Sequence, residues 1–409
     1  MNNIEELIAQ LCPEGVEFRE LGEVMSITRG ASPRPILNYL TNDPDGISWI
    51  KIGDVNSKYK YITKTKERIT KEGAEKSRHL KKGDFVLSNS MSFGRPYILA
   101  IDGCIHDGWI SMQNFESELI SDFLYHLLRS DIVQKYWKQK ASSGTVQNLN
   151  ADIVKATKIP IPPLPIQQEI ANILDNFMQF EAELQVELEA RMRQYEYYRN
   201  DLLNFENKVV EWKTLGEIGE FVRGNGLQKK DFTETGVGCI HYGQIYTYYG
   251  TFAHKTKTFV SPEFAKKLRK AQKGDLIIAT TSENVEDVCK MVAWLGDDEI
   301  AVSGDAYIYK HNQNPMYLAY YLQTPMFFDH KKKYMTGTKV IRVSGKDMAK
   351  FKIPIPPLTE QNRIVAILDQ FNKLVNDISV GLPAEILARR KQYEYYRGKL
   401  LDFKSVSNG

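Results

Sequence analysis

The chain has 409 residues, of which 42% are hydrophobic and 26% are charged, and its formal net charge is +3. This length leaves room for two domains with cores of their own, and the composition is ordinary for a globular protein. No run of about 18 apolar residues is present, which argues against a membrane-spanning helix, and the N-terminus is acidic where a signal peptide would be basic. We therefore expect a cytoplasmic protein. Because the net charge is small, contact with nucleic acid would require local clusters of basic residues.

Residues 1–157 are predicted to form a first α+β globe. Short runs of β-forming residues at 49–52, 85–87 and 97–99 alternate with glycines and polar turns, and a helical stretch at 123–137 closes the domain. Two loops are rich in short polar side chains that can pair with base edges or phosphate oxygens. The candidates for DNA contact in this globe are Lys51, Ser90, Arg95 and Gln147. For any single loop, simple exposure to solvent is the more common reason for such a composition.

Residues 158–207 are predicted to form a long spacer helix. Four prolines between residues 160 and 165 force an extended approach, after which a helix can begin, because its first turn has no use for the missing N–H. Apolar residues then follow a 3-4 ladder typical of a helix that packs against another helix. At about 1.5 Å per residue this helix spans on the order of 60 Å. We interpret it as a spacer between two globular bodies.

Residues 208–351 repeat the plan of the first globe. Residues 240–244 correspond to 50–54, with His241 at the position of Lys51, while the sequence between such anchors differs strongly. The candidates for DNA contact here are His241, Thr281 and Lys339, all in or beside polar loops. Two copies that keep a frame and change their side chains are typical of two domains that recognise different sequences.

Residues 352–409 repeat the proline-rich approach and the helix. The segment 352–358 is identical to 158–164 at an offset of 194 residues. At the starts of the two globes, the patterns Val-Glu-aromatic-basic and Arg-Gly recur at the same offset. Gly381 and Pro383 predict a kink or a short break within this second helix. The matching ladders favour packing of the two long helices against each other, antiparallel and with pseudo-twofold symmetry.

Each long helix also carries the hexapeptide sequence Gln-Tyr-Glu-Tyr-Tyr-Arg, at residues 194–199 and 392–397. The first and third tyrosines stand at heptad spacing, so we expect them to pack between the helices. The remaining side chains, Tyr197, Arg199, Tyr395 and Arg397, are then predicted to point outward. Exposed tyrosine and arginine are typical of a protein interface, which makes these four residues candidates for subunit contact.

The chain lacks the motifs of common catalytic sites. It has no P-loop, no GxGxxG after a strand, no HExxH, no GxSxG and no Asn/Asp-Pro-Pro-aromatic tetrapeptide of amino-methyltransferases. The four cysteines, Cys12, Cys104, Cys239 and Cys289, are far apart and have no zinc-site spacing, so we expect reduced thiols. The sequence therefore predicts no catalytic residue and no metal site.

The alternation of two variable globes, each opened by Leu-Gly-Glu, with two copies of Ile-Pro-Ile-Pro-Pro-Leu and Gln-x-x-Ile-x-x-Ile-Leu-Asp-x-Phe resembles the specificity subunits of type I restriction-modification systems. The resemblance covers essentially the whole chain. The imperfect tetrads at residues 181–184 and 185–188 resemble the branch of that family with tetrapeptide repeats in the central helix.

The resemblance implies a non-catalytic subunit. Each globe would be a target recognition domain that reads half of a bipartite DNA sequence, and the two helices would form an antiparallel spacer. The implied partners are double-stranded DNA, two methyltransferase subunits and nuclease/translocase subunits, with no membrane. No cofactor is expected on this chain, since S-adenosylmethionine would be held by the methyltransferase subunits.

Two other readings stay open at the level of sequence. One is a single-chain DNA methyltransferase or nuclease whose motif is not recognisable. The other is a purely structural helical scaffold without DNA contact, which would leave the divergence of the two globes unexplained.

Overall fold

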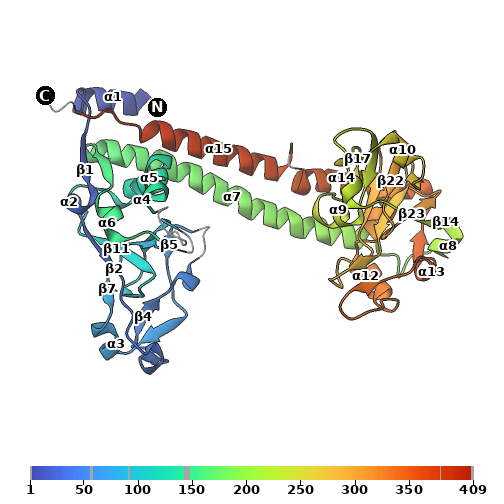
Figure 1. Cartoon of the computed structure of the whole chain (residues 1–409), viewed down its shortest axis with the longest axis horizontal. Coiled ribbons are helices and arrows are strands. Elements are labelled where there is room, and N and C mark those ends of the chain that lie inside the picture. The colour runs from blue at the N-terminus through green and yellow to red at the C-terminus, as the bar shows by residue number, and fades with distance from the viewer. Residues whose placement is uncertain (1, 56–58, 91–92, 142–147, 378, 407–409) are drawn as a thin grey trace. The chain divides into compact units, whose positions relative to one another are not determined.

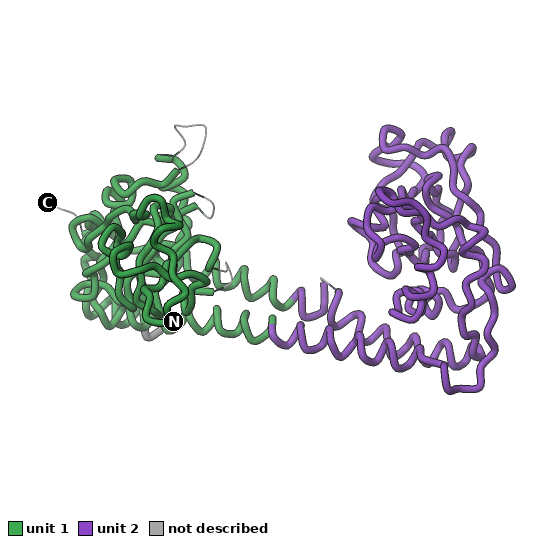
Figure 2. Tube along the Cα trace, turned by 90° about the horizontal axis from the view of Figure 1, so that it is seen from below, with its two compact units in different colours: residues 1–185, 385–409 green, residues 186–384 purple. Residues whose placement is uncertain are grey.

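The computed structural model describes residues 2–55, 59–90, 93–141, 148–377 and 379–406. The chain divides into two compact units, which Figure 2 distinguishes by colour: unit 1 contains residues 1–185 and 385–409, and unit 2 contains residues 186–384. Each unit joins one globe to parts of the long helical segments. The sequence-based division after residues 157, 207 and 351 stays a prediction, because compactness groups each globe with its helices.

Unit 1 holds two mixed sheets, each of five strands within the described residues. The first has the order β2-β11-β8-β9-β5, formed by Ser26–Arg29, Trp109–Gln113, Phe85–Ser88, Pro96–Leu99 and Tyr61–Ile62. The second has the order β3-β6-β4-β10-β7, formed by Leu40–Thr41, Glu67–Ile69, Ile47–Ile50, Gly103–Ile105 and Arg78–Leu80. The helical elements are α1 (Asn2–Leu11), α2 (Leu21–Val24), η1 (Ile36–Asn38), η2 (Ile52–Asp54), α3 (Lys71–Glu75), α4 (Ser121–Leu128), α5 (Asp131–Ala141) and α6 (Ala151–Lys155).

Unit 2 repeats this topology, except that its second sheet has four described strands and no counterpart of β3. Its first sheet has the order β14-β23-β19-β21-β16, formed by Gly219–Arg223, Ala306–His311, Leu276–Ala279, Met291–Trp294 and Phe252–Ala253. Its second has the order β17-β15-β22-β18, formed by Thr258–Val260, Val237–Ile240, Ile300–Val302 and Lys270–Ala271. A small extra sheet pairs β20 (Thr281–Ser282) with β24 (Ile341–Arg342). The helical elements are α8 (Leu215–Ile218), η3 (Lys229–Asp231), α9 (Tyr242–Thr247), α10 (Pro262–Ala265), α11 (Pro315–Tyr321), α12 (Pro325–Lys332) and α13 (Gly345–Met348).

The proline-rich approaches form the same short ribbon in both units. In unit 1, β12 (Lys158–Ile161) pairs antiparallel with β1 (Glu17–Glu20), and in unit 2, β25 (Lys352–Ile355) pairs antiparallel with β13 (Glu211–Thr214). These edge pairings tolerate the prolines, which could not donate in the middle of a sheet. The ribbons tie the start of each globe to the start of the helix that follows it.

The long helical segments are α7 (Leu164–Leu202), α14 (Leu358–Asn376) and α15 (Leu382–Leu400), labelled in Figure 1. The predicted break near Gly381 is confirmed, since α14 ends before it and α15 begins after it. In unit 1, α7 and α15 run antiparallel: Phe177 stacks on Tyr396 with ring centroids 5.2 Å apart, and Glu181 pairs with Arg390 at 2.5 Å. A residue later in α7 therefore meets a residue earlier in α15.

A buried glutamine fastens each globe to the start of its helix. Gln167 Oε1 accepts a hydrogen bond from Ile120 N at 2.9 Å, and its Nε2 donates to Pro162 O at 2.8 Å. In unit 2, Gln361 Oε1 accepts from Asn314 N at 3.0 Å, and its Nε2 donates to Pro356 O at 2.8 Å. Both side chains are fully buried, so loss of either would leave buried backbone groups unpaired.

The helical closure of each globe differs from the prediction. The stretch predicted at 123–137 is two helices, α4 and α5, and the equivalent part of unit 2 also holds two, α11 and α12. In unit 2 the second helix restarts at Thr324, whose hydroxyl caps Phe327 N, and Pro325 then takes the first helical position. The α+β class, the internal repeat and the antiparallel helix pairing are confirmed.

Candidate functional site

A cleft of about 540 Å³ opens in the globe of unit 1 where β2, β4, β8 and β10 end. We call it the strand-end cleft. It is lined by Arg29, Lys51, Ile52, Gly53, Asn89, Ser90, His106, Asp107, Gly108 and Asn148. Two residues chosen from sequence, Lys51 and Ser90, thus share one concave surface with an arginine and two asparagines. Such side chains can donate to phosphate oxygens and to base edges.

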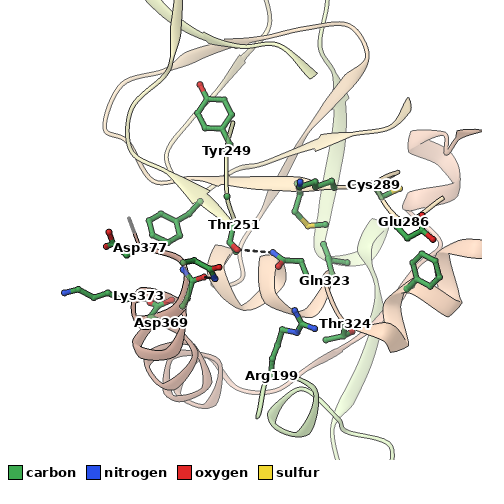
Figure 3. Close-up of a pocket in the computed structure, with 18 of the residues that line it drawn as sticks. Arg199, Tyr249, Thr251, Glu286, Cys289, Gln323, Thr324, Asp369, Lys373 and Asp377 are labelled. Atoms are coloured by element: carbon green, nitrogen blue, oxygen red, sulfur yellow. Dashed lines mark hydrogen bonds between the residues drawn. The ribbon is translucent and has the colours of Figure 1, made fainter. Parts of the chain in front are cut away.

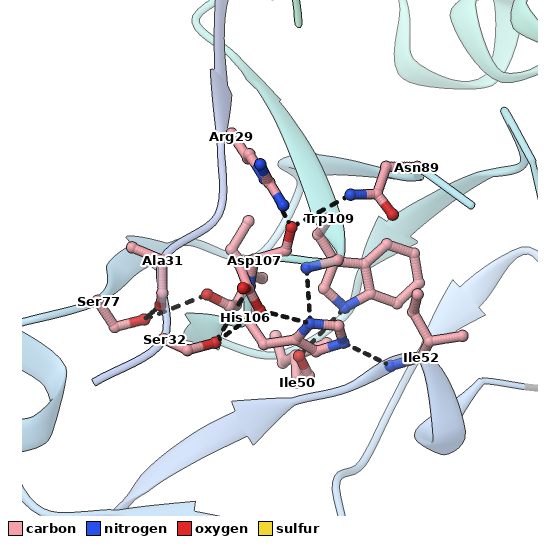
Figure 4. Close-up of polar contacts among 12 residues, drawn as sticks. Arg29, Ala31, Ser32, Ile50, Ile52, Ser77, Asn89, His106, Asp107 and Trp109 are labelled. Atoms are coloured by element: carbon pink, nitrogen blue, oxygen red, sulfur yellow. Dashed lines mark hydrogen bonds and ion pairs between the residues drawn. The ribbon is translucent and has the colours of Figure 1, made fainter. Parts of the chain in front are cut away.

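The loop at residues 106–108 lines this cleft, and Figure 4 shows the polar contacts of His106 and Asp107. The carbonyl oxygen of Asp107 accepts from Arg29 Nε at 2.9 Å and from Asn89 Nδ2 at 3.2 Å. The carboxylate of Asp107 accepts from Ser32 Oγ at 2.9 Å, and this hydrogen bond is the main cause that holds the Asp107 pKa below its usual value. Arg29 and Asn89 are therefore held in place by backbone before any ligand binds.

His106 stands at the centre of the same loop. Its Nε2 lies 3.1 Å from Ile52 N and its Nδ1 lies 2.7 Å from Gly108 N, while Trp109 Nε1 donates to Ile50 O at 3.1 Å. Burial lowers the pKa of His106, so the ring is neutral near pH 7 and accepts from one of the two N–H groups. The ring orders the backbone beside Lys51 and is not free to act as a base.

Unit 2 repeats the frame of this cleft with different side chains. Arg223 Nε donates to Gly304 O at 2.7 Å, as Arg29 does to Asp107 O, and Tyr242 N donates to Ser303 Oγ at 2.8 Å, as Ile52 N does to the His106 ring. Sheet pairing aligns β15 and β22 as it aligns β4 and β10. The hydrogen-bonded backbone arrangement is therefore the same in both units, while the side chain at its centre is an imidazole in unit 1 and a hydroxyl in unit 2.

The repeated Arg-Gly pair has a steric reason. A Cβ added to Gly30 would lie 2.1 Å from His106 O, and one added to Gly224 would lie 2.2 Å from Ser303 O. No other residue fits so close to backbone, so the glycine lets the strand pass the loop and present its arginine. Sequence reasoning missed Arg29, Arg223, Asn89 and His106 as cleft residues, although the Arg-Gly repeat was a usable signal.

The predicted contact residues of unit 1 do not all lie together. Lys51 and Ser90 both line the cleft, and Lys51 Nζ pairs with Glu67 Oε1 at 2.5 Å. Arg95 lies in a different cavity, with Arg129 and Arg397. Gln147 falls outside the described residues. The sequence grouped Arg95 with Ser90 because they are neighbours in one loop, but the turn before β9 separates their side chains.

In unit 2, His241 is buried to 8% exposure and its Nδ1 accepts from Gly243 N at 3.2 Å, so it caps α9. Burial lowers the pKa of His241, which keeps that ring neutral. Thr281 lies opposite Arg342 in the β20–β24 pair, and two hydrogen bonds of 2.9 Å between Thr336 and Arg342 close the turn that carries exposed Lys339. The small sheet thus brings Thr281 and Lys339 to one edge of the globe.

The four residues predicted to point outward from the helices divide into two kinds. Tyr197 and Tyr395 are exposed, at 66% and 64%, and each ring meets its neighbour edge-on, Tyr198 and Tyr396 respectively. Tyr198 in turn stacks on Phe371 at 5.3 Å, as Tyr396 stacks on Phe177. The outward placement is therefore confirmed for both tyrosines.

The outward placement is wrong for Arg397, and Arg199 is half-buried. Arg397 is 8% exposed, and its Nη2 donates to Asp131 Oδ1 at 3.1 Å on the globe of unit 1. Arg199 lines a cavity beside the globe of unit 2. The heptad pattern missed this because it considers only the contact between two helices, whereas each helix here also packs against a globe.

The described residues show neither a metal site nor a membrane helix. They contain no group of His, Cys, Asp and Glu side chains able to hold a metal ion, and none of their helices is both long and apolar enough to span a bilayer. The four cysteines are buried and unpaired, and burial raises the pKa of the Cys289 thiol to about 12. Such thiols are poor nucleophiles.

Comparison with known proteins gives a consistent result. The family model described as "Type I restriction modification DNA specificity domain" matches residues 13–190 and again 207–388. The specificity subunit of the type I restriction enzyme EcoR124I/EcoR124II of Escherichia coli is 35% identical over 268 residues, covering 61% of this chain and 65% of the relative. The putative specificity subunit S.HindORF215P of Haemophilus influenzae is 31% identical over 318 residues, covering 72% and 75%.

A solved structure of similar fold supports the architecture. One chain from a study of "complex assembly and conformational transition of the type I R-M system" aligns with TM-score 0.67 and 17% identity, covering 96% of this chain and 98% of that one. At this identity the likeness concerns the fold alone. The two family-model matches, one per globe with its helix, carry the assignment: the chain belongs to the DNA specificity subunits of type I restriction-modification systems, which recognise DNA and are not themselves catalytic.

Proposed function

We propose that this chain recognises a bipartite DNA sequence, with the globe of unit 1 reading one half-site and the globe of unit 2 the other. This proposal rests on one observation: both units have the same hydrogen-bonded backbone arrangement, but different side chains line it. Arg29 and Arg223 are held alike by backbone carbonyls, while Lys51 and His106 give way to His241 and Ser303. A fixed frame positions the protein on DNA, and variable side chains give each globe its own sequence preference.

The proposed roles follow from the place and charge of the described residues, and for Gln147 from its sequence alone. Lys51, Ser90 and Gln147 would contact the first half-site, and Thr281, Lys339 and His241 the second, with His241 acting through the backbone that it caps. The charged groups suit phosphate, and the hydroxyl and amide groups suit base edges.

The same chain would scaffold the enzyme. We propose that Tyr197 and Tyr395, exposed at equivalent places on the helices, each dock one methyltransferase subunit, since buried tyrosine is a frequent anchor of protein interfaces. The methyltransferase subunits would hold S-adenosylmethionine, and nuclease/translocase subunits would complete the restriction complex. Acting on host DNA, the assembly would work in the cytoplasm.

Methylome sequencing tests the reading role. The chain is expressed with its cognate methyltransferase subunit in a host that lacks other methylation systems. We expect methylation at a sequence with two specified halves separated by an unread gap, and none when this chain is omitted. Methylation of a continuous sequence, or methylation that persists without the chain, would contradict the proposal.

Co-purification tests the scaffold role. Tyr197→Ala and Tyr395→Ala should each remove about one of two methyltransferase copies, and the double variant should remove both. Tyr59→Ala is the matched control, because Tyr59 is 63% exposed and belongs to the globe of unit 1 rather than to one of the long helices. Equal loss in the control would argue against docking at the helix tyrosines.

A further inference from the structure

Unit 1 contains a second cavity, of about 390 Å³, whose walls carry three arginines. We call it the arginine pocket. It is lined by Phe93, Arg95 and Pro96 from the connection into β9, by Arg129 and Gln134 from the α4–α5 region, and by Arg397 from α15. The pocket therefore lies where the globe meets its helix pair.

Two of the three guanidinium groups are short of acceptors. Arg397 is 8% exposed, and although its Nη2 reaches Asp131, its Nε is buried without a hydrogen-bond partner. The Nε of Arg95 is buried and unpartnered in the same way. A buried charged donor without an acceptor is unfavourable by several times the net worth of an ordinary hydrogen bond, which makes an unfilled site a strong attractor for an anion.

The pocket carries an excess of positive charge. Within the described chain, Arg95 and Arg129 form no ion pair, and the carboxylate facing Arg397, that of Asp131, is 74% exposed. Arg129 lies over the rings of Tyr125 and Tyr393, at 5.3 and 5.7 Å. Stacking occupies the face of this guanidinium, and at its edge Nη1 donates to Tyr125 Oη at 2.9 Å. No described hydrogen bond occupies its Nε or Nη2, and such edge N–H groups suit phosphate oxygens.

Unit 2 has a cavity at the equivalent place, of about 800 Å³, drawn in Figure 3. Lys290 stands where unit 1 has Arg95, Gln323 where it has Arg129, Phe328 where it has Gln134, and Arg199 where it has Arg397. Here acidic side chains share the lining: Glu286, Asp369 and Asp377. The fold thus permits a nearly balanced cavity at this place, so the arginines of unit 1 are not a by-product of the helix packing.

We infer that the arginine pocket binds a phosphate group, and that its source is the DNA backbone beside the first half-site. The inference rests on the proposed function. The segment that contributes Asn89 and Ser90 to the strand-end cleft also contributes Arg95 to the pocket. Five residues span at most about 18 Å, the length of roughly five base pairs, so one duplex can reach both surfaces.

DNA-binding titrations of the full chain with its methyltransferase subunits test this assignment. Arg129→Gln copies the residue found at 323 in unit 2, and Arg95→Gln removes a guanidinium that lies over the Tyr97 ring at 5.8 Å and forms no ion pair within the described chain. Each should lower the salt slope of log K by about one, so that the rise in Kd between 50 and 200 mM salt shrinks about 3–4-fold, with the methylated sequence unchanged. Lys290→Gln is the matched control in unit 2 and should change the slope by less than half as much.

A second arm distinguishes the source of the phosphate. Thermal melts of wild type and Arg129→Gln are compared in inorganic phosphate and in chloride at equal ionic strength. Phosphate protection of wild type with an unchanged salt slope in both variants would assign the pocket to a free anion and overturn the DNA source. An unchanged slope together with lost methyltransferase co-purification would assign it to a protein carboxylate, again overturning the inference. Absence of sequence-specific binding by the wild type would instead defeat the proposed function itself.

Discussion

The two units match most closely where globe meets helix and differ most where each globe presents its cleft. At the joints, Gln167 and Gln361 make the same pair of backbone hydrogen bonds, and Phe177 and Phe371 stack on equivalent tyrosines. The sequence segments that repeat in this chain are therefore those that form the joints between globe and helix. The two copies keep the residues that fasten a globe to a helix and differ in the residues at the strand-end cleft and its counterpart.

The joints are not identical in every bond. Asp175 in unit 1 lies 2.8 Å from His126 Nε2 and 2.9 Å from Lys60 Nζ, whereas Asp369 in unit 2 accepts only from Tyr320 OH, at 2.6 Å, among the described contacts. An aspartate at one helical position thus serves an ion-pair network in one unit and a single hydroxyl in the other. The position is repeated because the helix must bind a polar group on α4 or α11, and the partner can vary.

Exchange of a whole globe should give the largest effect. Replacement of the residues before the Ile159–Pro160 bond with the globe of a relative should change one half of the methylated sequence and leave the other half and the gap intact. The reason is that the joint residues, which the relative must also supply, lie outside the cleft. Methylome sequencing measures the outcome.

The converse exchange is the control. Replacement of the unit 2 globe between the joints at 207 and 353 should change only the other half. If either exchange altered both halves, the globes would not be independent readers.

Acidification should weaken unit 2 through a residue that unit 1 lacks. Burial lowers the pKa of His311 to about 4, and its equivalent in unit 1 is Asn114, which does not titrate. Because the folded pKa lies below the unfolded value of about 6.5, the unfolded state binds more protons in between, and stability is lost as pH falls below 6.5. By pH 5 the loss should be about 2 kcal/mol.

Hydrogen exchange resolved by unit measures this loss, since a two-unit chain need not unfold in one step. His311→Asn should remove the pH dependence that His311 contributes, leaving that of His241 and His330. His79→Asn, at an exposed position on β7 of unit 1, is the control. An unchanged pH profile in His311→Asn would show that the ring is not the source.

The sequence predicted the arrangement of globes and helices well, because two copies of one pattern identify equivalent segments of the chain. The paired segments located both globes and both helices, and Gly381 with Pro383 located the break in the second helix. The anchor pair 50–54 and 240–244 proved equivalent in hydrogen bonding. The cleft was found only in part. Lys51 and Ser90 follow from polar composition, but Arg29 and His106 reach the cleft through sheet pairing, which links residues about 80 positions apart.

The arginines of the repeated hexapeptide show a different limit. A heptad pattern divides a helix into a buried and an exposed face, and Arg397 falls on the face that a two-helix contact leaves open. The globe covers that face in the folded unit. Only the three-dimensional arrangement reveals a third packing partner.

Single substitutions in the clefts should give a smaller effect than globe exchange. Lys51→Ala should weaken binding or relax one position of the first half-site by about 1–3 kcal/mol and leave the second half untouched. Its pairing with Glu67 keeps the side chain ordered, so the loss is one of contact rather than of folding. Thr281→Ala should act in the same manner on the second half alone.

Competition binding with singly substituted DNA sites measures which position relaxes. Lys82→Ala, at an exposed turn position of the same globe, serves as the control. Relaxation of positions in the opposite half would contradict the assignment of one globe to one half-site.

The smallest expected effect comes from altering the length of α7 at the boundary of the two units. The tetrad at 185–188 spans this boundary and the tetrad at 181–184 precedes it. Val186 is 66% exposed, while Leu188 packs toward the core of unit 2. One tetrad adds about 6 Å of helix and turns it by about 400°, an excess of roughly 40° over a full turn. B-DNA advances about 3.4 Å and turns roughly 34–36° per base pair.

Deletion of residues 185–188 should therefore shorten the unread gap by one base pair, or at most two, without changing the bases read. The rotational excess suits one base pair, whereas the rise would allow nearly two. Because the apolar ladder nearly repeats after four residues, the shortened helix keeps its seam toward its partner. Duplication of the same tetrad should lengthen the gap equally, and methylome mapping of both variants measures it. An unchanged gap at full activity would mean that α7 does not set the distance between half-sites, and that the two units adjust to DNA by another route.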